Sequence, residues 1–254
     1  MSWNVTNMGL FDFFKKSDTK PGESKELARL QKMVSNKLSQ NVDREDALYR
    51  LGELATPEAA RVLLSRFNWT LNPSIKDQEE KELAVRGIAS TGEKALEVIR
   101  SYCSRSETIT WPLKALRKIV TEDKLENELL GILDEFDTEY MRNPEPKIQL
   151  LQILGEFTSD DVRVAVQPFL TDTSELVRFA AVTTVLGCNH ESAVESLATA
   201  MVAEESLRVK NRVAIGIVER GWLIPSSIID SVKEACPPGF NLDKSGLLSG
   251  KPNG

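Results

Sequence analysis

Apolar residues recur every three or four positions along most of the chain, and this spacing predicts helices with one buried face. The clearest stretch runs from Leu176 to Val185, and Ala193, Leu197, Ala200 and Met201 continue the same spacing beyond a short break. No segment alternates apolar and polar residues over the length typical of a strand. We therefore predict an all-α protein without a sheet.

The helical pattern repeats along the chain with a period of about 34 residues, which is typical of helical repeat proteins. A glycine closes the first helical stretch in most copies, and one double step, from Gly87 to Gly155, spans two copies. The irregular third copy, residues 109–133, has Thr121 about where the glycine is expected. Each copy contains two helical stretches, which predicts five to six helix pairs that stack to form one core. The glycines are Gly52, Gly87, Gly155, Gly187 and Gly221.

The fifth copy carries the most informative motif, "ELVRFAAVTTVLG" at residues 175–187. With its Val-Arg, its paired alanines and its closing Leu-Gly, it resembles the HEAT family, especially the short bacterial form of the phycobilisome lyase-type HEAT-like repeats. Tetratricopeptide and ankyrin units have a similar period, but their signature residues are absent. The resemblance implies a right-handed α-solenoid of HEAT-like helix pairs, with the second helices lining a concave face.

Four segments follow from these patterns. Residues 1–23 form a flexible N-terminal segment with a short amphipathic stretch, and residues 24–42 form an N-terminal capping helix. Residues 43–236 form the repeat array. Residues 237–254, rich in Gly, Pro and Ser, form a disordered C-terminal tail.

Composition narrows the classes of partner. Lys plus Arg total 32 against 38 Asp plus Glu, a net charge of -6, which argues against nucleic acid as a partner. The three cysteines have no metal-binding or disulfide spacing, and no apolar run approaches the roughly 20 residues that cross a bilayer. These features favour a cytoplasmic protein with reduced thiols, and the HEAT-like resemblance implies a bacterial one. The thiols are those of Cys103, Cys188 and Cys236.

The only histidine, His190, is followed by Glu191. Some HEAT-like enzymes, the deoxyhypusine hydroxylases, hold two irons with several His-Glu pairs from separate repeats. A single pair cannot build such a site, so we expect His190 to lie in the turn between the two helices of the fifth unit. No nucleophile, phosphate-binding or dinucleotide motif is present. We therefore predict no catalytic residues, no metal and no cofactor.

The most distinctive charge feature is acidic. Eight acids and the single base Lys124 lie between Glu122 and Glu139, on the second helix of the third unit and the loop beyond it. This acidic stretch is either a solvated helix without a partner, as most runs of charge are, or a docking surface for a basic protein segment. The candidate partner-binding residues are Glu126, Glu128, Asp134, Glu135 and Asp137.

We accordingly predict a non-enzymatic, monomeric adaptor that binds a protein partner along its concave face. A lyase-type or chaperone accessory protein is one alternative. A HEAT-like DNA glycosylase is another, because Trp69, Trp111 and Trp222 lie near helix ends, but the acidic net charge opposes it. An alternative role in membrane contact rests on the stretch "LFDFF", which contains Leu10, Phe11, Phe13 and Phe14.

Overall fold

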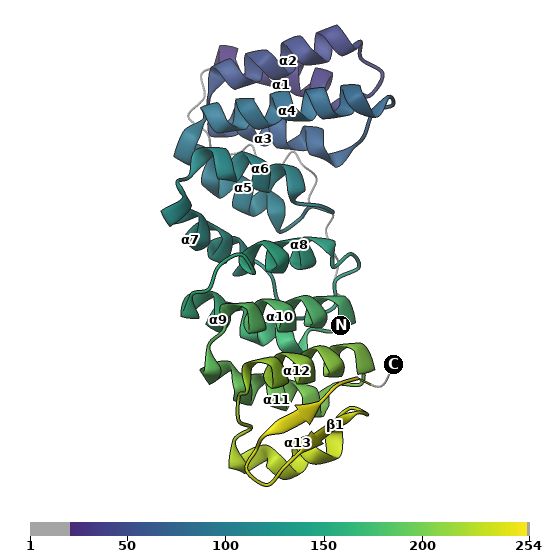
Figure 1. Cartoon of the computed structure of the whole chain (residues 1–254). Helices are drawn as coiled ribbons and strands as arrows, with labels where there is room; N and C mark the ends of the chain where they lie inside the picture. The colour runs from purple at the N-terminus through teal and green to yellow at the C-terminus, as the bar shows by residue number, and fades with distance from the viewer. Residues whose placement is uncertain (1–20, 253–254) are drawn as a thin grey trace, which may run out of the picture.

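The computed structural model describes residues 21–252, with side chains from residue 25 onward. This part of the chain is mainly helical, which confirms the prediction of a helical protein (Figure 1). Thirteen α-helices follow one another along the described residues: α1 (Pro21–Ser35), α2 (Asn41–Leu54), α3 (Pro57–Ser65), α4 (Ser74–Ser90), α5 (Leu96–Cys103), α6 (Thr110–Ile119), α7 (Glu122–Leu133), α8 (Glu145–Leu154), α9 (Asp160–Val166), α10 (Glu175–Cys188), α11 (Val194–Ala203), α12 (Leu207–Arg220) and α13 (Ile229–Ala235).

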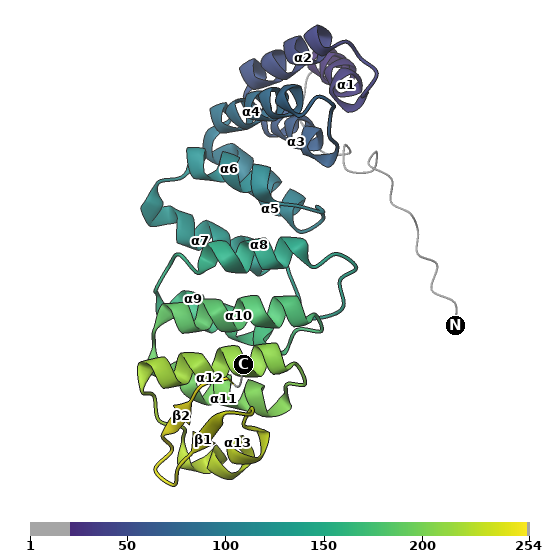
Figure 2. The ribbon, with the colours of Figure 1, turned by 45° about the vertical axis from the view of Figure 1, so that its right-hand side comes forward.

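Consecutive helices from α2 onward form six pairs, and the pairs stack side by side into one elongated array (Figures 1 and 2). The first helices of the pairs make one row, in which α2 packs on α4, α4 on α6, α8 on α10 and α10 on α12. The second helices make the other row, which begins with α1 against α3. A 3₁₀ helix, η4 (Gln167–Thr171), extends α9.

Each first helix buries the apolar face that its spacing predicts. In α10, Ala181, Val182 and Val185 are fully buried. The starts of several helices are fixed by side-chain caps: the hydroxyl oxygens of Thr56, Ser159 and Ser206 accept hydrogen bonds from the backbone N–H three residues on. The caps fix where these helices begin, and the buried apolar residues fix which face of each helix packs against its neighbours.

Small residues set the spacing between first helices. A Cβ atom on Gly87 would lie 2.8 Å from Leu63 Cδ1 and 3.1 Å from the Cα of Gly52 in the preceding unit. Only a residue without a side chain lets α2 and α4 approach this closely. Gly216 of α12 has the same role, because a Cβ atom there would clash with Leu186 Cδ1 of α10.

A basic residue occupies the same register in five of the six first helices, and the sequence patterns did not reveal it. In each case the residues three, four and seven positions further on are buried and apolar. Two of these bases reach the acid that begins the following unit: Lys147 contacts Asp172 at 2.8 Å, and Arg178 binds Glu204 through two hydrogen bonds of 2.7 and 2.8 Å. The five bases are Arg44, Lys81, Lys147, Arg178 and Lys210.

At the N-terminal end these bases belong to a buried network of five charges. Glu80 is fully buried and accepts hydrogen bonds from Arg44 Nη2 at 2.9 Å and from Arg66 Nε at 2.8 Å. Asp77 pairs with Arg66 at 2.8 Å and with Lys81 at 2.6 Å. The network ties α2, α4 and the end of α3 together, and its two carboxylates are paired with buried bases rather than with solvent.

The third pair departs from this scheme, as its weak repeat pattern indicated. Pro112 of α6 occupies the register of the basic residues, with Ala115 and Leu116 buried three and four positions later. Between the third and fourth units, polar links are added to the apolar core: Arg117 Nη2 lies 2.7 Å from a Glu156 oxygen, and Gln149 Oε1 accepts the Ile109 N–H at 2.9 Å. Long side chains therefore bridge this junction.

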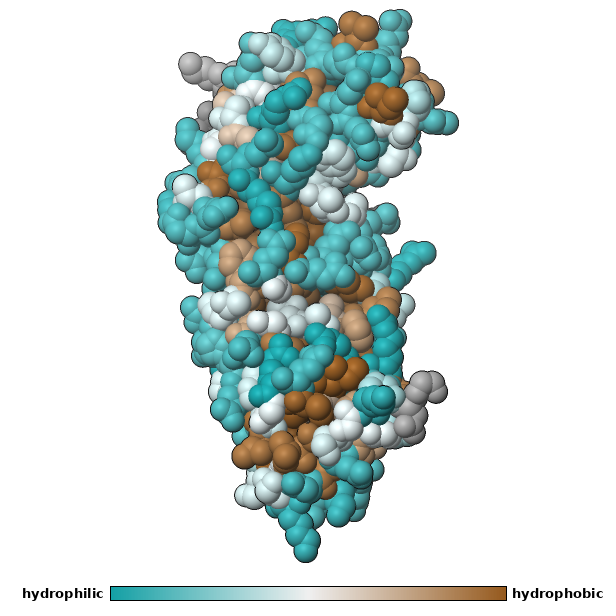
Figure 3. Space-filling model, viewed as in Figure 1, coloured by the Kyte–Doolittle hydropathy of each residue, from teal (hydrophilic) through white to brown (hydrophobic). Residues whose placement is uncertain are grey.

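The prediction of no sheet was wrong, and so was the prediction of disorder for the described part of the tail, residues 237–252. Two short strands, β1 (Phe240–Leu242) and β2 (Leu248–Gly250), pair antiparallel. Their side chains Phe240, Leu242 and Leu248 are buried, and the hairpin packs on α12 and α13. In Figure 3, apolar residues gather over α12 and the hairpin. The tail therefore closes the apolar end of the array.

At the other end, the single helix predicted for residues 24–42 is wrong in its bounds. α1 ends at Ser35 and the chain turns before α2 begins at Asn41, because Asn36 Oδ1 accepts the Leu38 N–H at 3.0 Å. The amphipathic stretch with Leu10, Phe11, Phe13 and Phe14 lies outside the described residues. Of the helices within residues 21–252, none has both the length and the apolar character that crossing a bilayer requires.

Candidate functional site

The acidic stretch covers α7 and the first half of the loop, residues 134–144, that leads to α8. Thr121 precedes α7, and the acids of its first turn, Glu122 and Asp123, lie where a helix dipole favours negative charge. The five predicted binding residues fall into two groups, which differ in their partners.

Glu126 and Glu128 interact with side chains of the neighbouring units. Glu126 accepts a hydrogen bond from the hydroxyl of Ser159, which caps α9. Glu128 lies 3.4 Å from Arg100 Nη2 of α5, and only 22% of its side chain is exposed. These two carboxylates link the third unit to the units on either side.

Asp134, Glu135 and Asp137 lie in the loop and are exposed. Asp137 is 78% exposed and 4.0 Å from Lys147 Nζ; among the described residues no base pairs with Asp134 or Glu135. Three hydrogen bonds hold the loop: the Thr173 N–H donates to Thr138 O at 3.2 Å, Lys147 Nζ donates to Glu139 O at 3.1 Å, and Asn143 Nδ2 donates to Glu107 O at 2.9 Å. We call Asp134, Glu135 and Asp137 the acidic loop.

An apolar groove begins beside this loop. It has a volume of about 530 Å³ and lies between α9 with η4 on one side and α11 on the other. Its Thr171 end adjoins the loop, since Thr173 is bonded to Thr138. Asp161 and Glu195 are exposed near its other end. The lining residues are Val164, Gln167, Pro168, Leu170, Thr171, Ser196, Thr199, Ala200 and Ala203.

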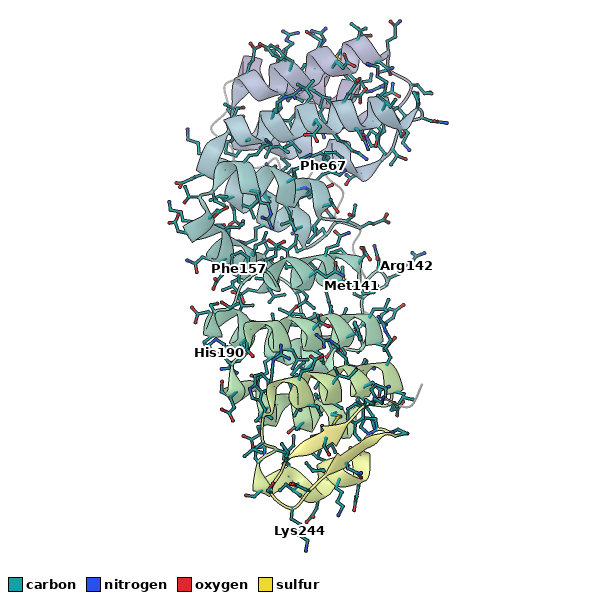
Figure 4. The ribbon with its side chains drawn as sticks, in the orientation of Figure 1. Phe67, Met141, Arg142, Phe157, His190 and Lys244 are labelled. Atoms are coloured by element: carbon teal, nitrogen blue, oxygen red, sulfur yellow. The ribbon has the colours of Figure 1, made fainter. Side chains whose placement is uncertain are left out.

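His190 lies in the turn between α10 and α11, as predicted. Its Nε2 is 2.9 Å from Thr158 O, and its Nδ1 is 3.5 Å from an Asp160 oxygen. His190 and Arg142 lie at opposite edges of the array (Figure 4). Within residues 21–252 no group of His, Cys, Asp and Glu side chains has an arrangement suited to a metal ion.

The tryptophans of residues 21–252 and the three cysteines occupy packing positions. The Arg66 guanidinium lies 3.8 Å from the centroid of the Trp69 ring, and Trp111 stacks on Phe67 at 6.0 Å. Trp222 is buried at the end of α12. None of the three cysteines is in a disulfide, and burial raises the pKa of the Cys103 thiol to about 12. A thiol with this pKa is not a nucleophile at neutral pH.

Comparisons with protein-family models, with curated proteins and with solved structures returned no match for the chain.

Proposed function

We propose that the protein is a non-enzymatic adaptor of the HEAT-like repeat class, a right-handed α-solenoid that works in the cytoplasm of a bacterium. It binds a protein partner that carries a basic segment. The order of the elements supports the class, because six helix pairs follow one another and apolar stripes bury one pair against the next. Surfaces of stacked repeats bind through area and charge.

The observation that carries the binding proposal is the acidic loop. Three exposed carboxylates stand together on a segment that Lys147 and Thr173 hold in place. Such a fixed group of like charges, in which only Asp137 has a base (Lys147) within 4.0 Å, attracts an oppositely charged partner and speeds its association. Glu126 and Glu128 link neighbouring units of the array instead, so the proposed binding site contains fewer residues than the sequence indicated.

The test is an affinity capture from a lysate of the source organism. The wild-type protein is compared with a variant in which Asp134, Glu135 and Asp137 are changed to lysine. A matched control changes Glu122 and Asp123, which are exposed at the other end of α7. We expect a basic protein that is captured by the wild type and the control and lost from the loop variant. Capture of the same proteins by all three would refute the proposed site.

A further inference from the structure

The groove between α9 and α11 has the features of a docking site for a helix. Its lining on α11 is one stripe, at positions 196, 199, 200 and 203, and the residues are small. On the other side the lining continues through Val164 of α9, which is 54% exposed, and Leu170 of η4. Grooves of this volume, within about 300–1,000 Å³, accept large apolar side chains. A helix laid in such a groove inserts side chains three or four positions apart.

Charge identifies the kind of helix. The acidic loop stands at the Thr171 end of the groove, and Asp161 and Glu195 stand near the other end. The nearby base Arg163 is neutralised, because its Nε lies 2.6 Å from Asp160 Oδ1 and its Nη1 donates to Gln167 Oε1. An anionic membrane surface would be repelled by this rim. A segment with lysines or arginines beside its apolar residues would be attracted.

We infer that the groove and the acidic loop form one site, which binds an amphipathic basic helix of a partner protein. The partner inserts bulky apolar side chains between Val164 and Ala200 and places its bases against Asp134, Glu135 and Asp137. This inference rests on the proposed adaptor function and names the chemistry of the partner.

The probe is a displayed library of random peptides about 12 residues long, the length at which an isolated helix becomes marginally stable. Peptides are selected on the full chain at about 0.15 M salt, where charges are screened beyond about 8 Å. Selected peptides are expected to carry two bulky apolar residues three or four positions apart, flanked by Lys or Arg. Their Kd is then measured by fluorescence anisotropy. Val164→Ser should weaken binding about tenfold, because apolar area worth about 1.4 kcal/mol is lost.

Two matched controls separate the parts of the site. Val42→Ser removes an equally apolar side chain that is 73% exposed on α2, far from the groove, and should leave Kd unchanged. Neutralising the acidic loop (Asp134→Asn, Glu135→Gln, Asp137→Asn) should weaken binding at least tenfold and reduce its salt dependence. Glu122→Gln with Asp123→Asn should change neither.

Three results overturn the inference: no peptide is selected, the selected peptides lack bases, or Val164→Ser and Val42→Ser behave alike. If neutralising the loop weakens binding while Val164→Ser does not, the groove is not part of the site and the adaptor proposal still stands. If lysate capture is unaffected by the loop variant, the adaptor proposal fails, whatever the peptides show. The two failures are therefore distinguishable.

Discussion

Glu80 is the residue on which the N-terminal charge network depends, and Glu80→Gln is the sharpest test of that network. Glutamine has nearly the same shape, so the change removes a charge without leaving a cavity. The wild-type network holds three bases (Arg44, Arg66, Lys81) and two acids (Asp77, Glu80), a net charge of 3 - 2 = +1. The variant raises the net charge to +2 among side chains that are almost entirely buried.

The magnitude follows from that burial. Removing one partner of a buried ion pair costs about 3–5 kcal/mol, because the remaining charge stays out of water without compensation. With a urea dependence of about 3 kcal/mol per M, the unfolding midpoint should fall by roughly 1–1.7 M. Circular dichroism at increasing urea concentration measures this shift.

The neighbouring residue provides the control. Glu79 is 53% exposed and pairs with Lys76 at 2.6 Å on the surface. Glu79→Gln should cost no more than about 1 kcal/mol, since exposed pairs contribute little. If the two variants unfold at the same urea concentration, Glu80 is not the centre of a stabilising network.

Two further predictions concern packing and pH. Gly216→Ala should lower stability by about 1–3 kcal/mol, since the new Cβ would meet Leu186, whereas Gly187→Ala, whose Cβ would meet only Gly155 O at 3.7 Å, should not; thermal unfolding separates the two variants. Burial disfavours the charged form of Glu204, but Arg178 and the Ser206 N–H outweigh burial and hold its pKa below the ordinary value of 4.5. Because the folded-state pKa is the lower one, this stabilisation is complete well above pH 4.5 and is lost as the pH falls through the folded-state value. The stability difference between the wild type and Arg178→Gln should therefore shrink between about pH 6 and pH 3; a constant difference would contradict the pairing.

The helices were predictable because their apolar spacing persists through many units, so the signal adds up. The hairpin was not predictable, because its two strands, Phe240–Leu242 and Leu248–Gly250, are too short to establish an alternation of period two. Its turn residues, Asp243 to Gly246, belong to a segment rich in Gly, Pro and Ser, a composition that is typical of a disordered tail. What orders them is local: Asp243 Oδ1 accepts the N–H groups of Ser245 at 2.8 Å and Leu247 at 3.0 Å.

The candidate site was predictable only as a region. A count of acids places Glu126 and Asp134 in the same run, yet Glu126 binds Ser159, 33 residues away, while Asp134 is exposed. The recurring bases of the first helices were missed for the same reason. From sequence alone, a base inside an apolar stripe is interpreted as a surface charge, because nothing nearby indicates its partner. The partner of Lys147 lies 25 residues further on.

The acidic loop belongs to the same departure from the regular repeat as the irregular third unit. Between α7 and α8 the chain runs through the long loop 134–144, whereas only the short segment 172–174 separates η4 from α10. Lys147 holds this long loop against the next unit, because its Nζ binds both Glu139 O in the loop and Asp172 at the start of that unit. The same ammonium group therefore fixes the loop and the residue that follows the Thr171 end of the groove. A base that stabilises the stack in the other units also orients, in this one, the surface that we propose binds the partner.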